Sequence, residues 1–304
     1  MTERICLVFN AQARRGRAWE VASILRAAVG QAAGAEWAPT EYPGHATALA
    51  EQAAAEGFQV VAALGGDGTA HEVANGLMRV PPERRPEMAI VPIGSGNDFS
   101  LSVGIPPEPE AAMRRVFEGR ARPADLGKVT DAAGRVTYFC NALGIGFDAN
   151  VTFHSYRITY LKGFSMYLWA VVQTILRNHN APRLRLEIDG ETIEQEALML
   201  TLCNGPREGG GFRVAPQARS DDGVLDYAMV ARVSRLMMFR LLPEVMNGTH
   251  GRFAQVRIGT FHSLALTADR PLPIHADGEV YAGFDSTVTS LRAEIAPAAL
   301  RVRV

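Results

Sequence analysis

The stretch VVAALGGDGTAHEVANGL, residues 60–77, runs from β-branched and apolar residues through glycines into a helical pattern. Its first residues predict a buried strand, and the residues after the glycines predict a helix. A glycine-rich turn between a strand and a helix directs free backbone N–H groups and the positive end of a helix dipole at an anion. The stretch therefore predicts a phosphate-binding turn in an α/β domain. At its centre lies Asp67, where a Walker-type loop carries lysine.

The chain on both sides of this turn alternates between strand and helix patterns. We expect strands at 5–9, 59–64 and 88–93, and helices at 18–29, 45–57, 69–78 and 109–119. Strands separated by short helices indicate a parallel sheet with helices on both faces, and ligands bind such sheets beyond the carboxyl ends of the strands. The glycine-rich loops after Leu64 and after Ile93 both fall at that edge.

From about residue 123 the pattern changes to strands joined by Asp-Gly and Ala-Gly turns, which is typical of antiparallel hairpins. Two predicted helices interrupt these strands, at 163–178 and 234–246. The sequence thus predicts an α/β domain over 1–122 and a mainly β domain over 123–304, whose last strand is a candidate to pack back on the first domain. The helix at 163–178 is apolar nearly all round, which favours a buried helix, and a face that touches lipid is the alternative.

The composition bears on the class of protein. The 304 residues include 31 basic and 32 acidic ones, so the charge does not point to nucleic acid. The longest apolar segment, 163–176, is shorter than the roughly 17–25 residues that span a bilayer. The three cysteines lie in apolar runs without metal-type spacing, and the N-terminus lacks the pattern of a secretory signal. We therefore expect a cytoplasmic protein with no transmembrane segment and no nucleic-acid partner.

A second glycine-rich loop, PIGSGNDFS at 92–100, strengthens the prediction of a phosphate site. It leaves a predicted strand through glycines and supplies Ser95, Asn97 and Asp98 as polar groups. The motif GGDGT also occurs in phosphofructokinases and nicotinamide dinucleotide kinases, although a purely structural turn is an alternative for this motif alone. Two such loops at neighbouring strand ends indicate phosphoryl transfer without naming an acceptor.

The chain resembles the diacylglycerol kinase catalytic family, which includes sphingosine kinases and small bacterial lipid kinases. The motifs that carry the resemblance span nearly the full length: Asn10 after the first strand, Thr40 before GHA, GGDGTAHEVANGL, PIGSGNDFS, ADLGKV, NALGIGFDANV, DDGVLDYAMV and ADGE. The resemblance implies a Rossmann-like α/β domain, similar to those of phosphofructokinases and NAD kinases, followed by a β-sandwich domain. There are two departures, because the family usually has Asn-Pro where Asn10-Ala11 stands and Thr where Ser95 stands.

The resemblance implies that ATP binds the first domain as a magnesium complex. The residues that it places around the nucleotide are Asn10, Thr40, Gly65, Gly66, Asp67, Gly68, Thr69, Glu72, Gly94, Ser95 and Asn97. Phosphoryl transfer needs cations on the transferred group, so Asp67 can face the metal or its water while backbone amides face the phosphates. Glu72 and Asp98 are candidates for the same ion. For Glu72, a favourable charge near a helix N-terminus is an equally good explanation.

A second metal site is implied at ARSDDGVLDY, residues 218–227. By pattern alone Asp-Asp-Gly is a turn. In bacterial members of the family the matching loop holds a structural magnesium, which carries over to Asp222 with the backbones of Arg219 and Val224. Asp125, in ADLGKV, is expected to reach the same network.

The motif IHADGEV, residues 274–280, is by pattern an Asp-Gly hairpin. The resemblance places a catalytic carboxylate at Glu279, as the general base that takes the proton of the acceptor hydroxyl. His275 is the rival base, but alternation along the strand favours a packed neighbour.

These residues together predict an ATP- and magnesium-dependent lipid kinase. Its acceptor is a hydroxyl of a lipid such as diacylglycerol, met at the membrane surface between the two domains. The alternatives are another acceptor, namely a sphingoid base, a ceramide, phosphatidylglycerol or a polyol, and a nucleotide-binding regulator without turnover.

Overall fold

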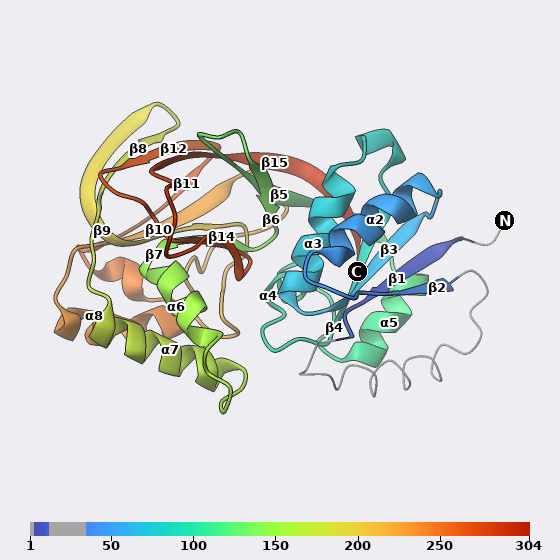
Figure 1. Ribbon diagram of the computed structural model, residues 1–304, viewed down its shortest axis with the longest axis horizontal. Coiled ribbons are helices and arrows are strands. Elements are labelled where there is room, and N and C mark those ends of the chain that lie inside the picture. The colour runs from blue at the N-terminus through green and yellow to red at the C-terminus, as the bar shows by residue number, and fades with distance from the viewer. Residues whose placement is uncertain (1–2, 12–34) are drawn as a thin grey trace. The chain divides into compact units, whose positions relative to one another are not determined.

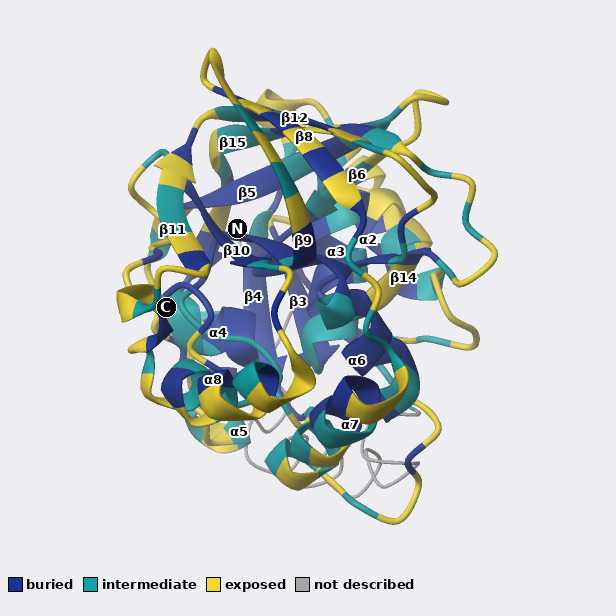
Figure 2. Cartoon of the chain, turned by 90° about the vertical axis from the view of Figure 1, so that its left-hand side faces the viewer, coloured by how far each residue is buried: buried dark blue, intermediate teal, exposed yellow. Residues whose placement is uncertain are grey.

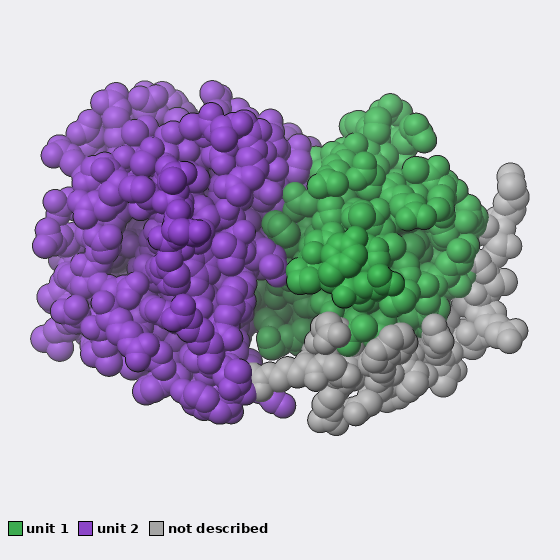
Figure 3. Space-filling view, viewed as in Figure 1, with its two compact units in different colours: residues 1–125, 298–304 green, residues 126–297 purple. Residues whose placement is uncertain are grey.

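The computed structural model describes residues 3–11 and 35–304 (Figure 1). Contacts divide the chain into two compact units, Met1–Asp125 with Ala298–Val304, and Leu126–Pro297 (Figure 3). The first is an α/β unit and the second a β-sandwich with helices, so the predicted fold class is confirmed. The helix predicted at 18–29 lies outside the described residues.

Unit 1 is built on a parallel sheet with the order β15-β4-β3-β1-β2. Its strands are β1 (Ile5–Phe9), β2 (Ala35–Pro39), β3 (Val60–Gly65), β4 (Glu87–Pro92) and the end of β15 (Ser290–Arg303). Every residue of β1 and β3 is buried, as expected for strands covered on both faces. The register pairs Leu64 with Val91 and Gly65 with Pro92, so β3 and β4 end at the same edge.

The described part of unit 1 contains the helices α2 (His45–Ala55), α3 (Asp67–Met78), α4 (Asp98–Ser102) and α5 (Pro109–Glu118), with a 3-10 turn, η2 (Pro82–Arg84). Helix α2 buries a row of alanines and packs on α3. Gly76 allows this close approach, because a Cβ there would lie 2.3 Å from the carbonyl oxygen of Thr47. The contact lies in the C-terminal half of α3, and Asp67 and Glu72 lie in its N-terminal half.

Unit 2 contains β5 (Ala121–Asp131), β6 (Val136–Phe139), β7 (Ala142–Gly146), β8 (Arg183–Ile188), β9 (Glu191–Cys203), β10 (Leu225–Ala231), β11 (Val256–Phe261), β12 (Ser263–Ala268), β13 (Ile274–Ala276) and β14 (Glu279–Ala282). Strands β5 and β15 each have residues in both units, because the unit boundaries fall after Asp125 and after Pro297. The first half of β9 pairs with β8, and its second half pairs with β7 and β10. Strand β9 therefore joins the two sheets that enclose the sandwich core, which includes Phe139, Leu186, Leu200, Leu202, Phe261 and Leu266.

The helices of unit 2 are α6 (Phe147–Ser155), α7 (Phe164–Arg177) and α8 (Arg235–Asn247), with a 3-10 turn, η3 (His250–Arg252). They cover a second apolar core on the β9–β10 sheet. Ser234 caps α8 by accepting a hydrogen bond from the amide of Met237. In α7, Ala170, Thr174 and Ile175 are buried while Trp169 and Leu176 are exposed. The prediction of a helix buried all round is therefore wrong, since α7 is covered on one face only (Figure 2).

Among the described residues, none of the helices has the length and apolarity needed to cross a bilayer. The longest, α7, has 14 residues.

Candidate functional site

The two glycine-rich loops of unit 1 touch each other. The first leads from β3 into α3 and the second from β4 into α4. A Cβ on Gly94 would lie 2.4 Å from the Cα of Gly66, a distance that real Cβ atoms do not reach. Glycine at both positions therefore lets the two backbones meet, which leaves a surface of backbone groups rather than side chains at the edge of the sheet.

Asp67 fastens the two loops together. Its carboxylate accepts hydrogen bonds from the amides of Asn97 at 2.7 Å and Phe99 at 3.2 Å. Asn97 has a left-handed backbone with φ 56°, and its side-chain amide closes the loop on both the amide and the carbonyl of Gly94. Since hydrogen bonds to a carboxylate are stronger than neutral ones, Asp67 is a main determinant of the second loop's position.

Asn10, Thr40 and Thr69 lie at the same edge. The side-chain amide of Asn10 donates to Oγ1 of Thr69 at 3.1 Å, and the backbone amide of Thr40 donates to Phe9 at 2.9 Å. Thr69 occupies the space beside Gly65, where a Cβ would come within 2.1 Å of Oγ1. The structure thus brings together most of the predicted nucleotide residues, namely Asn10, Thr40, Gly65, Gly66, Asp67, Gly68, Thr69, Gly94, Ser95 and Asn97. Ser95 is exposed.

Two of the other predicted carboxylates of unit 1, Glu72 and Asp125, contact backbone groups. Glu72 accepts from the amides of Gly44 at 2.8 Å and Ala46 at 3.0 Å, so it caps the start of α2. Asp98 is buried at the start of α4. Asp125 accepts from the amide of Ala298 at 2.6 Å, where β15 has a positive φ of 48°. Glu72 and Asp125 therefore hold segments of the backbone in place through these hydrogen bonds.

The loop that contains Asp222 leads into β10, which carries a second carboxylate, Asp226. Oδ1 of Asp222 lies 3.3 Å from the amide of Val224, and the side chain of Arg219 pairs with Asp221 at 3.1 Å. Burial and the charge on Asp222 raise the pKa of Asp226 to about 6. A buried carboxylate beside a second carboxylate offers oxygen ligands of the kind that a hard cation such as magnesium prefers.

The β13–β14 turn of unit 2 holds Glu279 on a tightly fixed backbone. Asp277, at φ 52°, is buried and accepts from the amides of Cys140, Asn141 and Ala142 at 2.7, 2.7 and 3.1 Å. The hydroxyl of Tyr156 donates to the carbonyl of Gly278. Glu279 itself is exposed at the start of β14. Burial and the nearby charge of Glu279 raise the pKa of Tyr156, so this carboxylate lies close to the tyrosine hydroxyl.

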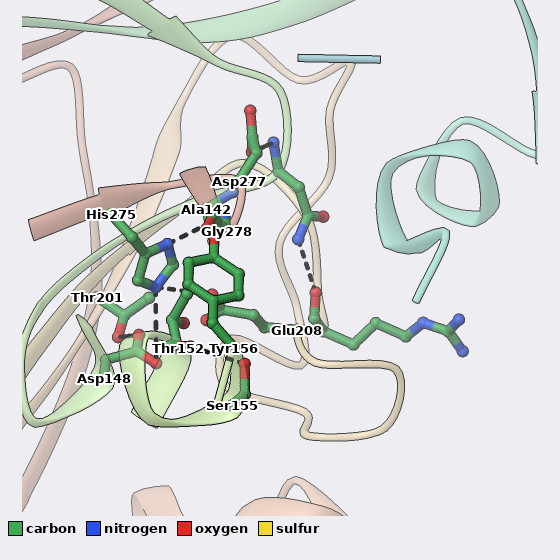
Figure 4. A network of polar contacts seen from close by, with 12 residues as sticks. Ala142, Asp148, Thr152, Ser155, Tyr156, Thr201, Glu208, His275, Asp277 and Gly278 are labelled. Atoms are coloured by element: carbon green, nitrogen blue, oxygen red, sulfur yellow. Dashed lines mark hydrogen bonds and ion pairs between the residues drawn. The ribbon is translucent and has the colours of Figure 1, made fainter. Parts of the chain in front are cut away.

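A buried polar cluster lies behind this turn (Figure 4). Nε2 of His275 is 3.0 Å from Oε1 of Glu208 and 3.8 Å from Oδ1 of Asp148. The hydroxyl of Thr201 donates to Oδ2 of Asp148 at 2.5 Å. Sequence reasoning named only His275 of these residues. Asp148 lies in the motif NALGIGFDANV and could have been noted there, whereas Glu208 gave no signal.

Comparison with known proteins identifies the class of the chain. A model described as diacylglycerol kinase catalytic domain matches residues 4–129, and one described as YegS C-terminal NAD kinase beta sandwich-like domain matches 141–304. A "Probable lipid kinase YegS-like" protein of Chromohalobacter salexigens is 35% identical over 78% of this chain and 74% of its own. The chain belongs to the diacylglycerol kinase catalytic family. The family identified from the motifs is thereby confirmed.

Other proteins are similar to the chain over comparable or greater lengths. A "Diacylglycerol kinase" of Staphylococcus aureus is 29% identical over 79% of this chain and 74% of its own. A solved structure of a diacylglycerol kinase from Bacillus anthracis superposes with a TM-score of 0.73 at 21% identity, over 99% of this chain and 96% of that one. The structure of yeast NADH kinase complexed with NADH superposes with a TM-score of 0.55 at 10% identity, over 100% of this chain and 83% of that one. These structures show the shared fold of the two domains, and the roles of single residues stay predictions.

Proposed function

We propose that this chain is a lipid kinase that transfers the γ-phosphoryl group of ATP to a hydroxyl of a lipid such as diacylglycerol. The observation that carries the proposal is the contact of two glycine-rich loops at one sheet edge, joined by the carboxylate of Asp67. Catalysis of phosphoryl transfer rests on positioning and on charge stabilisation, which backbone amides at such an edge can supply. The names of the relatives, lipid kinase and diacylglycerol kinase, support the same class of reaction.

The nucleotide would lie against the edge formed by Asn10, Thr40, Thr69 and the two glycine-rich loops. The close contact of Gly66 with Gly94 fits phosphate oxygens, since neither glycine has a side chain that would hold a ligand away from the backbone. Magnesium, when bound, would neutralise charge on the transferred group. Asp67, whose carboxylate already accepts two amides, is the proposed anchor for that ion or its water.

A substitution at Gly94 tests this part of the proposal. We expect Gly94→Ala to weaken ATP binding by about 10-fold or more, because the new Cβ would lie 2.4 Å from the Cα of Gly66 and must displace one loop. Calorimetric titration with ATP and magnesium measures the effect. Gly251→Ala is the matched control, since its Cβ meets only the end of Ile258 at 3.1 Å. Unchanged affinity in Gly94→Ala would place the phosphates elsewhere.

Glu279 is the proposed general base. The acceptor oxygen attacks the γ-phosphorus, Glu279 takes the hydroxyl proton, and the bond to the bridging oxygen breaks with its electron pair leaving on ADP. Asp277 and Tyr156 hold the backbone of the turn, so the carboxylate is presented on a rigid element. Transfer requires the nucleotide of unit 1 and the acceptor at Glu279 to meet during turnover.

The surface of α7 and α8 supports an acceptor that resides in a membrane. Trp169 and Leu176 of α7 and Leu236 and Phe239 of α8 are exposed, and the two helices are in contact. Arg177 and Arg235 are exposed at helix ends, whereas Arg240 pairs with Glu244. Glu244, the carboxylate that the two helices contain, is buried. Exposed apolar side chains among cations suit an anionic lipid surface.

A direct assay tests the reaction class. The protein, labelled ATP and magnesium are incubated with vesicles that carry diacylglycerol, a sphingoid base, ceramide or phosphatidylglycerol, and with a polyol in solution. We expect label in phosphorylated diacylglycerol on a thin-layer plate. Label in another compound would identify that compound as the acceptor. ATP binding without transfer to any of these compounds would favour a nucleotide-binding regulator.

The loop with Asp222 is the proposed site of a structural magnesium. We expect Asp222→Ala to lower turnover by about 10-fold at low magnesium and to be partly restored by raised magnesium, because one carboxylate of the donor set is lost. Activity is measured across a magnesium titration. Asp221→Ala is the matched control, because its carboxylate pairs with Arg219 on the same loop. Equal magnesium dependence in the two variants would remove the metal from this loop.

A further inference from the structure

The cluster of Asp148, Glu208 and His275 is formed by residues from three separate elements. Asp148 lies in the first turn of α6, Glu208 in the loop between β9 and β10, and His275 on β13. The imidazole is completely buried, while the two carboxyls are slightly exposed. Gly144 makes room for the cluster, because a Cβ there would lie 2.2 Å from Nε2 of His275 and 2.5 Å from Oδ2 of Asp148.

The loop that carries Glu208 and the turn that carries Glu279 have a common anchor. The backbone carbonyl of Asn141 accepts a hydrogen bond from the amide of Asn204 at 2.8 Å. The side-chain amide of Asn141 donates to the carbonyl of Arg207 at 2.9 Å. The amide of the same Asn141 donates to the carboxylate of Asp277. Glu208 is therefore held at a defined position relative to the β13–β14 turn.

The hydrogen bond at Nδ1 of His275 decides where the ring carries its proton. The amide of Gly278 donates to Nδ1 at 3.2 Å, so Nδ1 is an acceptor and the proton lies on Nε2. If both ring nitrogens carried a proton, the N–H group at Nδ1 would face the backbone N–H group of Gly278. Nε2–H points between Glu208 and Asp148 and makes a linear hydrogen bond with neither.

The charges of the cluster favour a proton on the ring, and they raise the pKa of His275 to about 10. Burial and the charge of Asp148 raise the pKa of Glu208 to about 7. Burial disfavours charge on His275, but the charges of Glu208 and Asp148 raise its pKa. A second ring proton would lie on Nδ1, where the N–H of Gly278 opposes it, so the contact at Nδ1 favours the neutral ring against the pull of the two carboxylates.

We propose that Glu208 and Asp148 are positioning residues for the general base: they fix His275 as the Nε2–H tautomer, and Nδ1 then holds the amide of Gly278, the residue next to Glu279. The inference rests on the proposed role of Glu279. An imidazole so oriented restrains the turn from inside, in addition to the contacts of Asp277 and Tyr156 from either side. Fixing a ring tautomer through its second nitrogen is a general way to orient a functional group.

The same three residues are also a possible ligand set for a transition metal, since their ligand atoms lie within 4.8 Å of one another. A metal on Nε2 requires that nitrogen to lose its proton and Nδ1 to carry one. The amide of Gly278 opposes a proton on Nδ1. The contact at Nδ1 therefore favours a proton on Nε2 over a metal ion.

Nitrogen NMR of the histidines tests the tautomer without reference to activity. We expect the wild-type protein to show His275 with a protonated Nε2 and an unprotonated Nδ1 that accepts a hydrogen bond, unchanged by added zinc or manganese. His275→Gln identifies the signal. An Nδ1–H tautomer, an imidazolium at pH 7.5, or a shift of the ring signals on addition of stoichiometric metal would overturn the proposal.

Kinetics of two variants test the consequence. We expect Glu208→Ala to lower kcat by about 10-fold with an unchanged KM for ATP, because the ring loses the carboxylate nearest to Nε2, at 3.0 Å, and the turn loosens. Glu208→Gln keeps an acceptor for Nε2–H and should restore kcat to within about twofold of wild type. Equal loss in both variants, or a change in KM for ATP alone, would contradict a positioning role. If Glu279→Gln leaves turnover intact, the proposed base fails, while the tautomer measured by NMR still stands.

Discussion

Replacing Glu279 by glutamine is expected to lower turnover by about 10²–10⁴-fold, the range for a positioned acid or base. The amide cannot take the proton of the acceptor hydroxyl, and it keeps the shape of the carboxylate. ATP affinity should remain near the wild-type value, because the proposed partner of Glu279 is the acceptor and not the nucleotide. Turnover at saturating lipid and calorimetric titration with ATP separate the two quantities.

The structure strengthens this expectation, because it removes two rival bases of the same motif. His275 is completely buried, and the carboxylate of Asp277 is buried on three backbone amides. Glu279 is the exposed carboxylate of the turn. Glu191→Gln, at the exposed start of β9, is the matched control for the change of charge. Lost ATP affinity would assign Glu279 to the nucleotide or its metal, and near-full turnover would exclude it as the base.

The glycine-rich loops were predictable from sequence because their determinants are local. A strand, two glycines and a helix within about ten residues define each loop, and parallel strands bring both loops to one edge. The partner of Glu72 was not predictable in the same way. Its carboxylate caps α2 at Gly44, 28 residues away, and this contact depends on the packing of α2 on α3.

Two other features depend on packing that sequence periodicity does not report. Helix α7 is apolar on most sides, but its neighbours α6 and α8 decide which face is covered, and Trp169 and Leu176 stay exposed. The cluster around His275 needs the space above Gly144 and the anchoring of Asn141, both of which arise from pairing among distant strands. Glu208 could not be singled out before that pairing was known.

Asp67→Asn is expected to lower turnover by about 10–100-fold, the range for a lost metal ligand or outer-shell group. The carboxylate accepts the amides of Asn97 and Phe99, and the substituted side chain offers one oxygen and one NH2 group in its place. One of the two amides then faces a donor, so the second loop shifts. Removal of the charge also weakens the proposed hold on magnesium.

Two measurements separate these effects. Loss of a charge-assisted hydrogen bond costs about 1.5–3 kcal/mol, so the melting temperature of Asp67→Asn should fall by several degrees. Asn97→Ala shifts the same loop by removing the contacts with Gly94 and leaves the carboxylate in place. If Asp67 binds the metal, only Asp67→Asn should raise the magnesium concentration needed for half-maximal turnover. Glu83→Gln, on the exposed turn η2, controls for the change of charge. If Asp67→Asn and Asn97→Ala respond identically to magnesium, the role of Asp67 is to hold the loop. If Asp67→Asn keeps more than about a tenth of wild-type activity, Asp67 does not contact the metal or its ligands.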